Sequence, residues 1–112
     1  MRVKDIPNSY EKATLLLSRK QERKVSHNGY LLRLSPDTIM LKLHNTVIVT
    51  WYQNGEIKLN HANWITRTTQ VWLNYALRGV GYVSISNDSM KFVHEKDHTI
   101  QDIGGGGLTT SA

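Results

Sequence analysis

The dipeptide Asn54-Gly55 lies between two strand-like runs and constrains the fold more than any other feature of the chain. Both central residues of a two-residue type I′ turn need positive φ, and Asn-Gly meets that need well. The dipeptide therefore predicts a β-hairpin in which Gln53 lies opposite Glu56.

This predicted register assigns each hairpin side chain to one face, because side chains alternate along a strand. Trp51 falls on the more polar face, beside Lys58. A tryptophan side chain in that position is expected to pack against another group. The alternatives for that group are a helix, another subunit and a stacked ligand. The opposite face is predicted to form the core, and it carries Ile48, Tyr52, Ile57 and Leu59.

A helix is predicted near the N-terminus, over about 9–20. Asn8 is the expected N-cap, and Glu11 stands where a capping-box carboxylate can reach back to it. The charged run 19–24 is typical of a solvated helix end, with a phosphate-contact patch as the alternative. Tyr10, Ala13, Thr14 and Leu17 recur at helical spacing.

The middle of the chain predicts an antiparallel meander. Alternating runs at 30–34 and 39–43 flank a turn at 35–38 with Pro36 at its second position, and a β-branched run follows at 46–52. A second helix is predicted over 69–78, capped by Thr68 and ended by Gly79. A last hairpin should turn at Asn87-Asp88, with Ser86 opposite Ser89.

These elements predict an α+β fold: an N-terminal helix, a four-stranded antiparallel meander, a second helix and a C-terminal β-hairpin. Residues 1–103 are expected to form a single domain. Residues 104–112 are expected to form a flexible glycine-rich tail, because four consecutive glycines lack periodicity.

The cysteine content, the apolar runs and the net charge of the chain exclude some classes of function and favour others. The chain has no cysteine, which excludes disulfides and thiolate chemistry. It has no apolar run long enough to span a bilayer and no secretory signal, so we expect no membrane association and a location in the cytoplasm. The formal net charge of +5 favours partners that carry phosphate or carboxylate groups.

The stretch 61–77 gathers polar side chains around one tryptophan just before the second helix. Thr66, Arg67 and Thr68 follow Trp64 closely, which is more than helix capping requires. A helix start with free amides, hydroxyls and a guanidinium is a natural anion site, and Trp64 offers a flat face to a base. The alternative is that Trp64 is a buried staple between sheet and helix.

The histidines are weaker candidates. His44 lies between two strands, where it either bonds a tight turn or acts as a general base without an identifiable carboxylate partner. His94 and His98 lack a third ligand, so we predict no metal site and no cofactor. His44 and Lys58 complete the candidate ligand-binding set, and no catalytic residue is assigned.

The chain resembles a family of short proteins, mostly described as hypothetical, encoded by tailed bacteriophages. The resemblance spans about 25–77 and rests on the pattern LHxTxIVT from Leu43, Asn54-Gly55, Leu59-Asn60 and WxTxTT from Trp64. Two positions depart from the family: Ala62-Asn63 replaces a usual Gly-Gly, and Gln70 replaces a basic residue. The resemblance implies a phage accessory role in the host cytoplasm and no particular activity.

We therefore expect a non-enzymatic accessory protein that binds nucleic acid or a nucleotide and counters a host defence or host enzyme. The alternative is a protein-interaction module, such as a host-enzyme inhibitor or small virion component, with Trp51 and Trp72 as anchors. A homo-oligomer and a host protein partner are compatible with both hypotheses. A nuclease that uses His44 or His61 is the third hypothesis.

Overall fold

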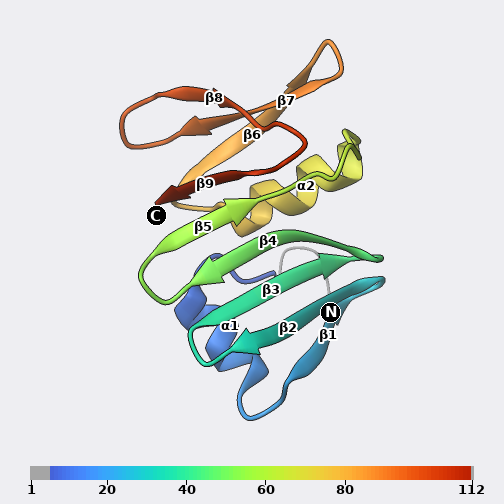
Figure 1. Ribbon diagram of the computed structural model, residues 1–112, viewed down its shortest axis with the longest axis vertical. Coiled ribbons are helices and arrows are strands. Elements are labelled where there is room, and N and C mark those ends of the chain that lie inside the picture. The colour runs from blue at the N-terminus through green and yellow to red at the C-terminus, as the bar shows by residue number, and fades with distance from the viewer. Residues whose placement is uncertain (1–5, 112) are drawn as a thin grey trace.

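The chain folds into two antiparallel sheets with a helix between them (Figure 1). The computed structural model describes residues 6–111. The elements in chain order are α1 (Tyr10–Leu17), β1 (Glu22–Ser26), β2 (Gly29–Ser35), β3 (Thr38–Leu43), β4 (Thr46–Tyr52), β5 (Glu56–Leu59), α2 (Arg67–Ala76), β6 (Gly81–Ser86), β7 (Ser89–His94), β8 (Ile100–Asp102) and β9 (Leu108–Ser111).

The larger sheet has six strands in the order β1-β2-β3-β4-β5-β9. One row of side chains crosses the sheet and is apolar on every strand except β1, where Arg23 occupies it. This row and the next one form the main core, in which Leu31, Leu41, Val49, Trp51, Ile57 and Leu59 are almost fully buried.

Both helices lie on this same face, which we call the covered face. Arg23 and Arg33 point to it, and their guanidinium groups donate to the Leu16 and Ser18 carbonyls at the end of α1. These contacts satisfy carbonyls that the helix itself leaves unpaired. On the same face, Gly29 lies directly beneath the ring of Trp72 from α2.

The opposite side of the six-stranded sheet, which we call the open face, carries no helix of the described chain. One of its rows also crosses all six strands. The side chains of this row are Glu22, Leu32, Met40, Thr50, Lys58 and Thr109.

The smaller sheet has the order β6-β7-β8 and packs Val83, Met90 and Phe92 into the core. Asn87 and Asp88 both have positive φ, and Ser86 pairs with Ser89, so the predicted register of this hairpin is confirmed. Two side chains of α2 hold the edge strand β6: Asn74 accepts from the Val83 amide and Gln70 donates to the Val83 carbonyl.

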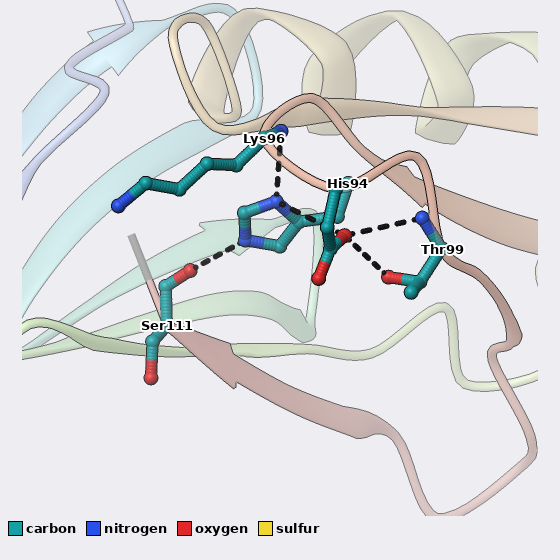
Figure 2. A network of polar contacts seen from close by, with 5 residues as sticks. His94, Lys96, Thr99 and Ser111 are labelled. Atoms are coloured by element: carbon teal, nitrogen blue, oxygen red, sulfur yellow. Dashed lines mark hydrogen bonds and ion pairs between the residues drawn. The ribbon is translucent and has the colours of Figure 1, made fainter.

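The C-terminal segment does not form the expected flexible tail in the part that the structure describes. Residues 108–111 form β9, which extends the larger sheet by pairing with β5. Figure 2 shows how His94 at the end of β7 fixes the end of β9. Its Nδ1 accepts from the Lys96 amide at 3.1 Å, so its Nε2–H donates to the Ser111 carbonyl at 3.1 Å.

The expected α+β class is confirmed, but a four-stranded meander plus one hairpin is wrong, since nine strands form two sheets. The predicted register around Asn54-Gly55 is also wrong by one residue. Trp51, not Tyr52, pairs with Ile57, and only Gly55 has positive φ. The turn is therefore a three-residue loop that ends in a left-handed glycine.

The corrected register explains Trp51. The residue lies on the covered face, is 1% exposed, and needs neither a second subunit nor a ligand to cover it. Trp72 is 4% exposed. Neither tryptophan can therefore serve as the exposed interface anchor that the protein-interaction hypothesis required.

The first helix also starts one residue later than predicted. Ser9, not Asn8, is the N-cap, and its hydroxyl accepts from the Lys12 amide. Asn8 instead donates to the Arg78 carbonyl, which ties the N-terminal segment to the end of α2. The charged run 19–24 is not only a helix end, because β1 begins at Glu22.

Candidate ligand-binding site

An open cavity of about 500 Å³ lies at one end of the covered face, between the β3–β4 turn and the start of α2. Its floor is apolar and its rim is polar, the composition expected of a small-molecule site. The lining residues are Leu43, His44, Asn45, Thr46, Ile48, His61, Trp64, Thr66, Thr68 and Thr69.

A β-bulge in β4 shapes the floor. Leu41 pairs with Val49 while Lys42 pairs with Val47, so Ile48 is an extra residue outside the ladder. The bulge lets Ile48 join the buried side of the sheet, where it is 2% exposed and lines the cavity. Bulges commonly re-aim side chains next to binding sites.

His44 lies in the β3–β4 turn that forms one side of the rim. Its φ is 55°, and its amide donates to the Asn28 carbonyl at 2.7 Å. The backbone of His44 therefore holds the turn, while its exposed side chain lines the cavity. No carboxylate lines the cavity to orient this imidazole as a general base.

The loop that carries Trp64 is held by three local hydrogen bonds. The Asn60 side chain accepts from the Ala62 amide, His61 Nδ1 accepts from the Asn63 amide, and the Trp64 amide donates to the His61 carbonyl. Trp64 is 64% exposed, so it is not the buried staple that was the alternative interpretation. The loop instead presents an accessible indole to the cavity.

The buried side chain of His61 supports this loop through hydrogen bonds. The residue is 2% exposed, and because Nδ1 accepts from the Asn63 amide, Nε2 must carry the proton that is donated to the Ile103 carbonyl at 2.6 Å. Both ring nitrogens are therefore engaged in the fold. This arrangement does not support His61 as a nuclease base.

The other side of the rim is the start of α2. The helix begins at Arg67, and its N-cap is Thr66 rather than the predicted Thr68. The Thr66 hydroxyl accepts from the Thr69 amide at 3.3 Å. The amides of Arg67 and Thr68 have no acceptor among residues 6–111, so this helix end points two unpaired donors outward.

The structure brings together four of the six predicted site residues. Trp64, Thr66, Thr68 and His44 all line the cavity. Arg67 is exposed in the first turn of α2 but is not part of the wall. Lys58 lies on the open face, on the other side of the sheet, and takes no part in the cavity.

Six of the ten lining residues were outside the candidate ligand-binding set, and one of them, His61, entered only the nuclease hypothesis. Leu43, Asn45, Thr46 and Ile48 come from the β3–β4 turn and its flanks, and Thr69 comes from the turn of α2 that Thr66 caps. Leu43, Thr46 and Ile48 belong to the same LHxTxI pattern as His44, so that pattern was the available signal. The bulge that turns Ile48 inward has no clear sequence signature.

No protein-family model, curated protein or solved structure matches the chain. Across the described residues, no three histidine, aspartate or glutamate side chains gather where they would hold a metal ion. Neither helix in this range is long and apolar enough to cross a membrane.

Proposed function

We propose that this chain is a non-enzymatic accessory protein of a tailed phage that binds a nucleotide, or a nucleotide unit of a nucleic acid, in the cavity beside Trp64. One observation carries the proposal: the cavity joins an exposed indole to a helix start with two unpaired amides. A nucleotide pairs a flat ring with an anionic phosphate, and the two ends of the site match these two parts.

Size and electrostatics support this assignment. A volume of about 500 Å³ lies within the usual range of small-ligand pockets. The start of α2 favours negative charge, and the Arg67 guanidinium in the same turn adds a cation. The net charge of +5 favours the approach of an anion.

The chemistry of the lining supports binding rather than catalysis. Hydroxyl, imidazole and amide groups surround the cavity, but no carboxylate accompanies them, and His61 is committed to the fold. The two motifs of the phage-family resemblance, LHxTxI and WxTxTT, supply most of the lining. Sequestering a nucleotide that a host defence requires is a role in the host cytoplasm that fits such a site.

The test is titration calorimetry of the purified chain with nucleoside mono-, di- and triphosphates. Trp64→Ala removes the stacking face and should weaken binding by roughly 5- to 100-fold. Arg67→Ala should weaken binding of the same nucleotide and make it less dependent on salt. Lys58→Ala on the open face is the matched control and should leave pocket affinity unchanged. Unchanged affinity in Trp64→Ala would contradict the proposal.

A further inference from the structure

We propose that the open face of the six-stranded sheet is a second binding site, specific for single-stranded nucleic acid. This face lies on the side of the sheet away from α1, α2 and the cavity, and no described helix covers it. The proposal goes beyond the nucleotide pocket, because it rests on different residues and a different surface.

The central feature is a cross-strand row in which two cations flank an aromatic ring. Lys24 on β1 pairs with Tyr30 on β2, which in turn pairs with Lys42 on β3. Neighbouring strands lie about 4.8 Å apart, so the two lysines stand roughly 10 Å from each other with the tyrosine between them. Neither lysine forms a salt bridge within the described chain.

A second tyrosine lies further along the same face. Tyr52 pairs with Thr38, four residues along β3 from Lys42 and two strands away from Tyr30. From strand geometry the two tyrosines stand roughly 16 Å apart. Leu32 and Met40 lie between these two rows and are half-buried. Leu32 and Met40 thus form a short apolar strip with one half-buried tyrosine towards each end.

The charges on this face complement a polyanion. Lys24, Lys42 and Lys58 point to it, against Glu22 and Glu56. Glu56 is engaged in the hairpin loop, where its carboxylate accepts from the Asn54 side chain. Arg19 and Lys20, both exposed, precede β1 and add positive charge at the edge where Lys24 lies.

The shape of the face selects a single strand over a duplex. In the described chain, the open face has no projecting helix or ribbon to enter a groove, whereas its tyrosines can stack on bases only when those bases are unpaired. Stacking platforms combined with lysines are the usual means of binding single strands without strong sequence preference. An acidic protein segment would use the lysines but would leave the tyrosines without a role.

The experiment measures fluorescence anisotropy of a labelled oligothymidylate of about 12 nucleotides with the full chain. Lys24→Glu and Lys42→Glu should each weaken binding at least fivefold, and Tyr30→Leu should weaken it to a similar degree. Lys96→Glu makes the same charge change in the exposed loop between β7 and β8 and should have little effect. Melting curves confirm that each variant is folded.

Two comparisons make the result decisive. Equal loss in Lys96→Glu and Lys42→Glu would show that only net charge matters, and equal affinity for a duplex of the same length would remove the role of the tyrosines; either outcome overturns the proposal. Trp64→Ala should leave oligothymidylate binding within twofold, while weakening mononucleotide binding by roughly 5- to 100-fold. Failure of the open-face site is therefore distinguishable from failure of the pocket.

Discussion

Gly29 on β2 and Trp72 on α2 are in direct contact, with the indole ring occupying the space where a β-carbon on residue 29 would lie. The close approach lets α2 sit against the sheet beside the β3–β4 turn, because Gly29 pairs with Leu43 at that end of β3. The position of the cavity thus depends on one residue having no side chain.

Gly29→Ala should destabilise the protein by about 1–3 kcal/mol, since the added methyl group must displace a buried ring. Urea denaturation followed by circular dichroism measures this loss. Gly106→Ala is the control, because a β-carbon there meets no atom within 4 Å, and it should change stability by less than about 0.5 kcal/mol. Equal stability of the two variants would show that Trp72 does not pack on Gly29.

Thr66→Ala should cost about 1 kcal/mol of stability, because it removes the hydroxyl that caps α2. Thr68→Ala should change stability by less than about 0.5 kcal/mol, since its exposed side chain has no partner within the described chain. Thermal melting of the two variants compares them directly. A larger loss of stability in Thr68→Ala than in Thr66→Ala would show that Thr68, the residue predicted from the sequence, is the N-cap of α2.

Removal of residues 104–112 should destabilise the domain by roughly 2–4 kcal/mol, because it breaks the β5–β9 ladder. A flexible tail would give no change. A sharper version compares Leu108→Asp, on the covered face opposite Leu59, with Thr109→Asp, on the open face. Only Leu108→Asp should lower the midpoint of urea unfolding substantially.

Asp37 should make stability depend on pH in the acidic range. Hydrogen bonds from the Ser35 and Thr38 hydroxyls hold the pKa of Asp37 below its ordinary value of 3.8. The ionised carboxylate therefore stabilises the fold above pH 3.8, and this contribution is lost as pH falls through the lower folded-state pKa.

Asp37→Asn should accordingly melt below the wild type at neutral pH, and the difference should shrink once the pH falls below 3.8. Ser35→Ala removes the stronger of the two donors and should reduce the same pH-dependent increment. Melting temperatures measured across the acidic range test both variants. A constant difference between Asp37→Asn and wild type at every pH would contradict the assigned hydrogen bonds.

The two hairpins show what sequence can and cannot specify. Asn87-Asp88 predicted the β6–β7 register correctly, because both residues tolerate positive φ and only a two-residue turn uses them in that way. Asn54-Gly55 is ambiguous, since Gly at the second position also suits a longer loop with one left-handed residue. The predicted two-residue turn therefore placed Trp51 on the wrong face of the hairpin.

The edge strands escaped prediction for a different reason. An edge strand needs no alternation of apolar and polar residues. The sequence of β1 therefore resembled a charged helix end, and β9 was not predicted because it follows a run of glycines. Of the candidate ligand-binding residues, Trp64, Thr66, Thr68 and His44 line one cavity. Lys58 lies away from the cavity, on the open face, because it pairs with Thr50. The predicted register had instead placed Lys58 and Trp51 on the same face.

The position of β9 has a consequence for how the protein is made. The partner of Leu59 in the larger sheet is Leu108, so the outer edge of β5 stays unpaired until β9 has been synthesised. Every other pairing in that sheet joins neighbours in the chain and forms during synthesis. A nascent chain that stalls within the glycine run therefore displays an unpaired apolar strand to other nascent chains, which makes aggregation on the ribosome the main hazard of this topology.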